Sequence, residues 1–280
     1  ESFALVSQRA RRRPFSRVSH SIGFMKSIQH RWRFAGRWAL RHMVLSVVIA
    51  LISAALVFGL WYPMPYRAML GVGGIYVLIL IVDVVCGPLI TFVLASPRKS
   101  RREMFLDLSL VGMIQMAALL YGMQAVWIGR PAVLAFEKDR LTVFSYCDGD
   151  HRDLHKAPPS LQTLSSTGLL KVGTRMPRDN NEFVDSVELS LAGFSPAMRP
   201  GWWEPIGRYH DAMRAHAKPL TELIDRRPND ALMLEKAAAE TGQPVGALTY
   251  LPLTSSKTKD WIALLDTTMQ VVGYAPVDGF

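Results

Sequence analysis

An acidic residue, Asp83, lies near the middle of a long apolar run that covers residues 70–95. A carboxylate at the centre of a bilayer costs at least about 2.5 kcal/mol on insertion scales, so this side chain must face protein, carry a proton or pair with a polar group. At about 1.5 Å per helical residue, Ser53 and Gln115 in two other apolar runs reach the same depth. The three side chains are therefore predicted to form one polar layer.

The residues that follow Asp83 favour close packing between helices. Gly87 and Thr91 lie on the helix face of Asp83 and are small enough to let another helix approach. Pro88 has no N–H, so it should kink the helix and free a carbonyl near the polar layer. Three roles are open for the layer: hydrogen bonds that hold the helices together, a docking point for a polar group of a partner helix, and an ion or proton pathway. A single acidic residue in three spans argues against a transporter.

A second group of versatile side chains follows later in the chain. Thiol, carboxylate and imidazole groups all bind metals, but their spacing here matches no established metal site, and the Asp-Gly-Asp run is ordinary turn sequence. A solvated loop and a metal site are the two alternatives. The residues are Cys147, Asp148, Asp150, His151, Asp153 and His155.

Motifs of known enzymes are missing from the sequence. It has no Gly-rich phosphate loop, no dinucleotide fingerprint, no G-x-S-x-G, no H-E-x-x-H and no paired C-x-x-C. We therefore predict no catalytic residues, no cofactor and no metal.

Two further groups of residues are candidate contacts outside the membrane. One is a pair of Trp residues that follows an Arg-Pro pair; exposed aromatic and Arg side chains are typical of protein interfaces, whereas buried ones would belong to the core. The other is an Arg-Pro pair where the third apolar run ends, and anchoring that junction is its expected role. The six candidates are Arg130, Pro131, Arg199, Pro200, Trp202 and Trp203.

Three apolar runs must position these residues. Residues 39–60, 70–95 and 106–128 each provide the roughly 20 residues that cross a hydrocarbon core of about 30 Å. Three such runs close together would leave a soluble core almost without a polar face. We therefore predict a three-helix transmembrane module over residues 39–129.

Loop charges predict the orientation of these helices. The sequence through Arg41 contains ten Lys or Arg and one Glu, and four basic residues fill the second loop, whereas Arg67 is the one basic residue of the first loop. By the positive-inside rule, the basic tail (residues 1–38) and the second loop are cytoplasmic. Residues 130–280 should then form a periplasmic domain of a bacterial inner-membrane protein. We expect residues 1–24 to be disordered, and Met25 is a natural start.

Charge and cysteine content indicate which partners and which disulfides to expect. The net charge of +9 divides into +11 before residue 130, where 15 basic residues face 4 acidic ones, and −2 from there on, where 17 face 19. The basic residues flank apolar helices, so we expect contacts with anionic membrane lipids and none with nucleic acid. Cys86 in the second run and Cys147 in the soluble part form no disulfide framework.

The soluble part is predicted to be a small α+β domain around an antiparallel sheet. Alternating and β-branched residues predict strands, and cap, proline and glycine signals predict helices. The expected strands are 132–137, 141–146, 169–174, 248–253, 261–266 and 270–274. The expected helices are 182–191, a stretch over 205–224 interrupted at Pro219, and 229–240 with Asn229 as cap and Gly242 as stop.

Several short motifs together resemble one known family, the TfpX/TfpZ-type type IV pilin accessory proteins. The resemblance covers residues 25–280, is most specific in the membrane half, and leaves out residues 1–24 and the Cys147–His155 group. In the soluble half it includes Phe136, Asp139-Arg140 and Arg199-Pro200. The membrane-half motifs are Trp61-Tyr62-Pro63, the run Asp83 to Pro88 with Thr91, Pro97 to Ser100, Asp107, Gln115, Tyr121-Gly122 and Arg130-Pro131.

The resemblance implies a non-enzymatic inner-membrane protein that helps a type IV pilin subunit become stable or ready for assembly. Such a pilin has one membrane helix with a buried acidic residue and a head outside, so a polar layer and an outer domain would match both parts. A membrane-bound periplasmic enzyme acting on pilin or on lipid-linked sugar, and a periplasmic ligand sensor, are the alternatives. The identity of the pilin and the oligomeric state stay open. The expected intramembrane contacts are Ser53, Asp83, Gly87, Pro88, Thr91 and Gln115.

Overall fold

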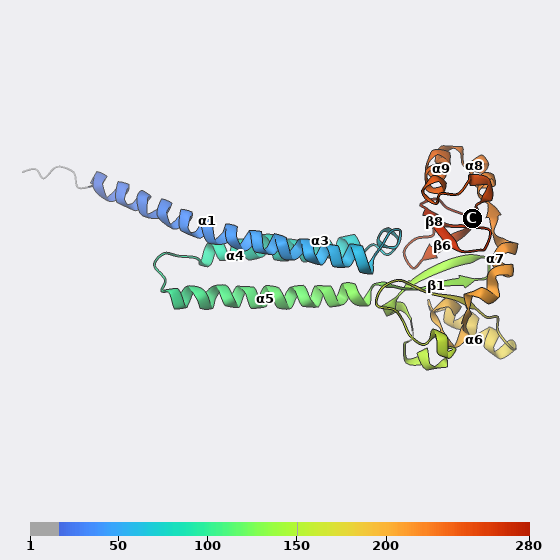
Figure 1. The fold of residues 1–280 in the computed structure, drawn as a ribbon. Helices are drawn as coiled ribbons and strands as arrows, with labels where there is room; N and C mark the ends of the chain where they lie inside the picture. Colours follow the sequence, from blue (N-terminus) through green and yellow to red (C-terminus); the bar gives the residue numbers. More distant parts are fainter. Residues whose placement is uncertain (1–16, 150) are drawn as a thin grey trace, which may run out of the picture. The chain divides into compact units, whose positions relative to one another are not determined.

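The computed structural model describes residues 17–149 and 151–280 (Figure 1). The chain divides into two compact units. The first contains the described residues up to Val48 together with Ile81–Ala117, and the second contains Ile49–Leu80 and Ala118–Phe280. The three predicted spans therefore each contribute to both units.

Three helical stretches are long and apolar enough to cross a membrane, which confirms the predicted number. Two of them include π-helical turns, in which the backbone is wider than in an α-helix. The stretches are Gln29–Trp61, Val72–Leu94 and Arg101–Ile128. Their elements are α1 (Arg17–Leu56), a π-helical turn (Val57–Trp61), α3 (Val72–Leu80), a π-helical segment (Ile81–Cys86), α4 (Gly87–Leu94) and α5 (Arg101–Ile128).

Helix α1 starts well before the first predicted span. It begins at Arg17, so residues 17–24, for which we expected disorder, are helical. A helix that has already formed extends at little cost, because each added residue gains a hydrogen bond without a new nucleation step. The rest of the expected disordered tail, residues 1–16, lies outside the described residues.

The soluble domain is built on one sheet with the strand order β4-β3-β1-β2-β6-β7-β8, and β5 pairs with β6. The predicted first hairpin and the closing antiparallel strands are present. In the hairpin, Glu137 pairs with Arg140, and Lys138 between them has a φ of 58°. The strands are β1 (Pro131–Glu137), β2 (Arg140–Ser145), β3 (Leu170–Thr174), β4 (Trp203–Pro205), β5 (Lys218–Pro219), β6 (Thr249–Ser255), β7 (Trp261–Leu265) and β8 (Val271–Ala275).

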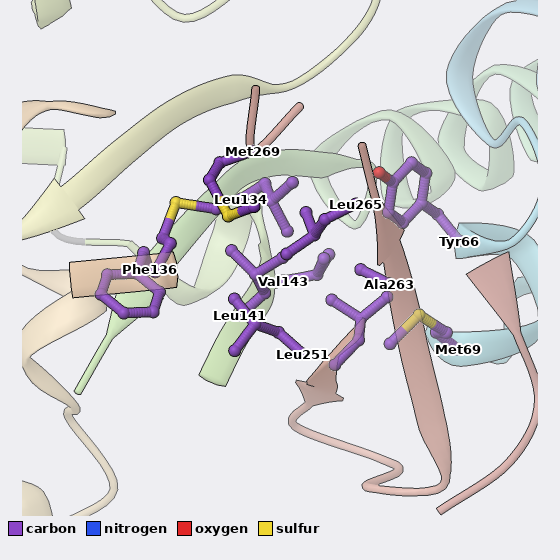
Figure 2. Close-up of a cluster of buried hydrophobic side chains, with 12 residues drawn as sticks. Tyr66, Met69, Leu134, Phe136, Leu141, Val143, Leu251, Ala263, Leu265 and Met269 are labelled. Atoms are coloured by element: carbon purple, nitrogen blue, oxygen red, sulfur yellow. The ribbon is translucent and has the colours of Figure 1, made fainter. Parts of the chain in front are cut away.

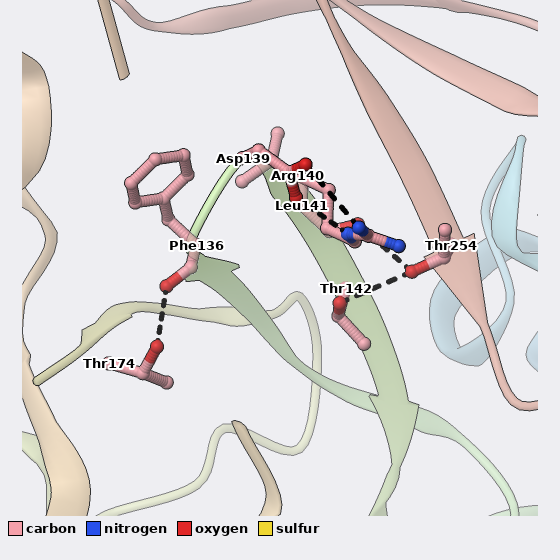
Figure 3. Close-up of polar contacts among 7 residues, drawn as sticks. All are labelled: Phe136, Asp139, Arg140, Leu141, Thr142, Thr174 and Thr254. Atoms are coloured by element: carbon pink, nitrogen blue, oxygen red, sulfur yellow. Dashed lines mark hydrogen bonds and ion pairs between the residues drawn. The ribbon is translucent and has the colours of Figure 1, made fainter. Parts of the chain in front are cut away.

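The sheet is mixed, which differs from the antiparallel sheet that we expected. Strand β3 runs parallel to β1, and β6 runs parallel to β2. Figure 3 shows a side-chain bond at each parallel pair: Thr174 Oγ1 donates to the Phe136 carbonyl at 3.0 Å, and the hydroxyls of Thr142 and Thr254 lie 3.2 Å apart. Parallel neighbours need long connections, and the strand pattern does not reveal which strands such connections bring together.

Four α-helices, with several short 3₁₀ helices, complete the described part of the soluble domain. Helix α9 ends before Gly242, which has a φ of +71° as a helix stop requires, but its N-cap is Asp230 and not Asn229. The stretch predicted over 205–224 contains two short helices separated by β5, because residues 218–219 pair with β6. The helices are α6 (Asn180–Leu191), α7 (His210–His216), α8 (Leu220–Arg226) and α9 (Ala231–Glu240).

Apolar side chains cover both faces of the sheet. In β1, Leu134 and Phe136 belong to one buried cluster, and Val133 and Ala135 belong to another. Helices α8 and α9 pack near β6 and β8 through a third cluster that includes Leu234 (Figure 1). Strand β1 is therefore buried almost continuously, as expected for a central strand.

The loop between the first two membrane helices is part of the soluble domain's core. It contains the short helix α2 (Tyr66–Met69), whose Tyr66 and Met69 lie among the buried side chains of the sheet (Figure 2). The Tyr66 hydroxyl lies 2.5 Å from that of Tyr274, and Ser255 Oγ donates to the Met69 carbonyl at 3.0 Å. Residues 49–80 and the sheet domain consequently form one unit.

Candidate partner-binding surfaces

Asp83 lies in the π-helical segment between α3 and α4 and is only 7% exposed. Its buried Oδ1 atom accepts no hydrogen bond from the described residues. Gln115 on α5 approaches it, but Gln115 Nε2 donates to the main-chain carbonyl of Asp83, at 3.0 Å, and not to the carboxylate. Gln115 Oε1 is also buried without a partner in the described part of the chain. Two buried polar atoms therefore remain unsatisfied at one place.

Pro88 explains why the carbonyl of Asp83 receives a side-chain donor. In a π-helical turn a carbonyl pairs with the N–H five residues later, and for Asp83 that residue is Pro88, which has no N–H. The amide of Gln115 donates to this carbonyl. That Pro88 frees the carbonyl stays a prediction, and the hydrogen bond from Gln115 fits it.

Gly87 makes room for Gln115. A Cβ atom at Gly87 would lie 2.0 Å from Gln115 Nε2 and 2.4 Å from its Cδ. Any side chain there would push the amide away from the Asp83 carbonyl. Gly87, Pro88 and Gln115 thus act together on the same main-chain atom.

Thr91 has a partner that the sequence reasoning missed. It is 1% exposed, and its Oγ1 lies 2.5 Å from Nδ1 of His42 on α1. A His within an apolar run is itself a signal, because ionisable residues at membrane depth usually have a functional or structural partner. His42 and Thr91 link α1 with α4.

Ser53 belongs to the second unit, and its hydrogen bonds lie there. Ser53 Oγ lies 2.7 Å from the Tyr76 hydroxyl and donates to the Ala50 carbonyl at 2.9 Å. Tyr76 also donates to that carbonyl, at 2.8 Å. Within the first unit Gln115 is hydrogen-bonded to Asp83, and within the second Ser53 lies beside Tyr76; the shared polar layer stays a prediction.

Arg130 and Pro131 lie where α5 joins the sheet. Arg130 is 4% exposed, and its guanidinium carbon lies 3.8 Å from the ring centre of Trp127 and 4.4 Å from that of Tyr146. Its Nη1 donates to the Trp127 carbonyl at 3.0 Å. Burial lowers the pKa of Arg130. These contacts fit the expected anchoring role and leave little of Arg130 for a partner.

The Trp pair is part of the core and does not form the exposed contact surface that we considered. Trp203 is 3% exposed and donates from Nε1 to the Ala197 carbonyl, at 2.8 Å. Trp202 is 9% exposed, and its ring centre lies 4.6 Å from the guanidinium carbon of Arg175 and 5.3 Å from that of Arg199. Pro200 is buried as well. Large rings beside strand β4 gain more from packing under the neighbouring loops than from contact with water.

Arg175 also holds helix α6, a contact that the sequence reasoning did not find. Its Nη1 and Nη2 donate to the two carboxylate oxygens of Glu182, at 2.8 and 2.5 Å. The main-chain N–H of Arg178 donates to the same carboxylate at 2.6 Å. These bonds lower the pKa of Glu182 from 4.5 to about 2. The first turn of α6 is therefore fixed by polar contacts.

The Cys147–His155 group forms local turn contacts. The main-chain N–H of Ser145 donates to Asp148 at 3.1 Å, and Lys156 pairs with Asp153 at 2.7 Å. His155 Nδ1 lies 2.8 Å from the Arg152 carbonyl. Among the described residues, which exclude Asp150, no group of three potential metal ligands comes together.

Comparison with known proteins finds sequence similarity to fimbrial assembly proteins. The family model of the fimbrial assembly protein FimB matches residues 30–71. The fimbrial assembly protein of serogroup E1 from Dichelobacter nodosus is 31% identical over 257 residues, which cover 90% of this chain and 98% of the relative. The serogroup I protein of the same organism is 32% identical over 257 residues, again 90% of this chain and 98% of the relative. No solved structure matches.

Proposed function

Since the chain belongs to the family of fimbrial assembly proteins, we propose that it is a non-enzymatic accessory protein that binds a type IV pilin subunit in the inner membrane. The family supports a role in pilus assembly, and the motifs shared with TfpX/TfpZ-type proteins favour an action on the pilin itself. The observation that carries the proposal is the buried polar cluster of Asp83 and Gln115.

This cluster has the chemistry of a docking point for a helix. Asp83 Oδ1 and Gln115 Oε1 both lack a hydrogen bond within the described part of the chain, and an unpaired buried polar group at membrane depth is costly. A polar group from the pilin's membrane helix would relieve that cost. Val85 and Cys86, next to Asp83 in sequence, are exposed, so a helix has a surface to approach.

Loop charge supports the orientation of this arrangement. With the basic N-terminal segment and second loop in the cytoplasm, the sheet domain lies in the periplasm, on the same side as the head of a membrane-anchored pilin. The membrane helix and the head of one pilin would then each face a part of this protein.

Anionic lipids are the second partner that we propose. A cavity of about 870 Å³ in the first unit is lined by the apolar side chains of Phe34, Trp38 and Phe105 and by the basic side chains of Lys99 and Arg101. Basic cavities beside apolar helices on the cytoplasmic side suit anionic headgroups.

Disulfide crosslinking from Cys86 tests the pilin contact. In a Cys147→Ser background Cys86 is the single thiol of the chain, and pilin variants carry one cysteine each along their membrane helix. We expect an oxidative crosslink from Cys86 to a limited set of pilin positions. Asp83→Leu should weaken it severalfold, because the pilin then loses its polar partner.

A matched control uses another apolar surface of the same unit. A cysteine placed at Leu110 of α5, which is 54% exposed, in a Cys86→Ser, Cys147→Ser background should give little crosslink. An unchanged Cys86 crosslink in Asp83→Leu, at normal amounts of both proteins, would contradict the proposed role of Asp83.

A further inference from the structure

Helix α6 contacts the domain through two polar positions and leaves several apolar side chains exposed. Glu182 and Ser186 face inward, and Ser186 is the one residue of α6 that is buried. At 100° per residue these two positions lie within 40° of each other. The apolar face of an amphipathic helix ordinarily packs against the core, whereas in α6 a polar residue, Ser186, is the buried one.

The outward face of α6 carries four large apolar side chains. Phe183 is 56% exposed, Val184 60%, Val187 44% and Leu191 86%. The spacing of one, four and eight residues from Phe183 puts all four within an arc of about 100°, which begins about 60° from Ser186. None of the buried apolar clusters in the described part of the chain includes a residue of α6.

This stripe forms one wall of a groove. Phe183, Val187 and Leu191 line a cavity of about 310 Å³ together with Met176 and Pro177, which precede the helix. Met176 is itself 68% exposed. The rest of the lining comes from the domain and includes the charged residues Glu137, Lys138 and Arg175, so the groove combines an apolar wall on α6 with charged groups.

Polar contacts keep the stripe in its outward orientation. Asp179 caps the helix by accepting a hydrogen bond from the Glu182 N–H at 2.8 Å, and Arg175 donates to the Glu182 carboxylate. Farther along, Arg199 Nη2 donates to the carbonyls of Ser186 and Phe194, at 3.2 and 2.5 Å. A helix held at both ends cannot roll its apolar face inward without losing these bonds.

Charge indicates what can cover the stripe. Helix α6 carries Glu182, Asp185 and Glu188 and no Lys or Arg. Glu188 lies about 40° from Val184 around the helix and so borders the stripe, and an anionic membrane surface would be repelled. A second copy packed α6 against α6 would bring like charges together. An apolar protein segment flanked by Lys or Arg fits the stripe best.

We propose that the apolar face of α6 is the docking surface for the pilin head, through an apolar segment of the head flanked by basic residues. This inference rests on the proposed function and assigns the contact outside the membrane to specific side chains. Arg175, Arg199 and Trp202 then act as positioning residues that hold α6 from the side of the domain. The contact complements the intramembrane one at Asp83.

Photo-crosslinking and affinity measurements on the full-length chain, purified with full-length pilin, test this assignment. A photo-crosslinking amino acid at Val187 should capture the pilin head. The double variant V187D/L191D should weaken pilin binding on the order of tenfold or more, because centrally placed apolar contacts dominate such interfaces. Both side chains are exposed, so folding should be preserved.

Leu232 on α9 provides the matched control, since it is 81% exposed and lies outside the groove. A crosslinker at Leu232 should not capture pilin, and L232D should bind pilin normally. Glu188→Lys should weaken binding at low salt and less at high salt.

The outcomes separate this inference from the proposed function. If Cys86 still crosslinks to pilin while Val187 captures lipid, a second copy of the chain or nothing, and V187D/L191D binds normally, the α6 surface is refuted and pilin binding stands. If neither Cys86 nor Val187 crosslinks to pilin, both proposals are refuted. Capture of the pilin head at Val187 together with weaker binding of V187D/L191D supports the α6 surface.

Discussion

The segment around Asp83 and helix α6 share one feature, a buried polar residue beside exposed apolar side chains, but we expect them to meet different solvents. Val85 beside Asp83 is 47% exposed, and Val187 on α6 is 44% exposed. In lipid an exposed valine is the ordinary state of a spanning helix. In water a continuous apolar stripe indicates a binding partner. Exposure therefore has a functional meaning only when the solvent is known.

Identical substitutions at these two valines should give the largest difference. Val85→Asp places a second carboxylate near the middle of a membrane helix and should cost about 2.5–3.5 kcal/mol of insertion free energy. Val187→Asp should change the stability of the purified protein by about 0.5 kcal/mol or less, because the side chain meets water. Membrane-integration assays and thermal unfolding measure the two effects. Equal loss of folded protein in both variants would break the comparison.

Removing the anchor of α6 should have the next largest effect. Arg175→Leu leaves Glu182 without its bidentate partner and should lower the free energy of unfolding more than the loss of an exposed single-bond ion pair. Arg214→Leu is the control, because its pair with Asp211 is far more exposed and should be worth about 0.5 kcal/mol or less. Chemical denaturation of both variants measures the difference. A stable Arg175→Leu protein would show that α6 is held by other contacts.

Two glycines test the packing around Asp83. Gly87→Ala displaces the Gln115 amide from the Asp83 carbonyl and should lose about 1 kcal/mol relative to Gly112→Ala, where nothing lies within 4 Å of the added methyl. Unfolding of both variants in the same detergent gives the comparison directly. Similar stabilities would mean that Gln115 finds an equivalent partner elsewhere.

A pH titration should give the smallest effect. The pKa of Glu182 is lowered to about 2 by Arg175, so its contribution to stability is fully present above about pH 4.5 and is lost as the pH falls towards 2. Protection of α6 amides from hydrogen exchange should decrease over that interval. Glu182→Gln should remove this dependence. A pH dependence that persists in Glu182→Gln would assign it to another carboxylate.

Local sequence patterns were sufficient to predict much of the architecture. Run length predicted three membrane helices, and alternation with a short turn predicted the β1–β2 hairpin. The missing N–H of Pro88 predicted a free carbonyl near Asp83, because that property belongs to the residue itself. Such features depend on a few neighbouring residues and are therefore readable from the sequence.

Other features depended on contacts between distant segments. The pattern of apolar residues along a strand is the same whichever direction its neighbour runs, so the parallel pairs β1–β3 and β2–β6 could not be predicted. Likewise, an isolated Trp pair gives no sign of whether loops will cover it, and Trp202 and Trp203 proved to be buried. The spacing of Phe183, Val184, Val187 and Leu191 was a visible signal of an amphipathic helix.

The sequence by itself determined that this protein has three membrane helices, a basic N-terminal segment and one α+β domain, because hydrophobicity and charge act locally along the chain. The tertiary structure decided which face of α6 turns outward: Arg175 and Arg199 hold Glu182 and the Ser186 carbonyl, and Phe183, Val184, Val187 and Leu191 stay exposed. It also decided that Gln115 meets the carbonyl of Asp83 and leaves Oδ1 unpaired. Both outcomes depend on geometry between elements that are far apart in the sequence.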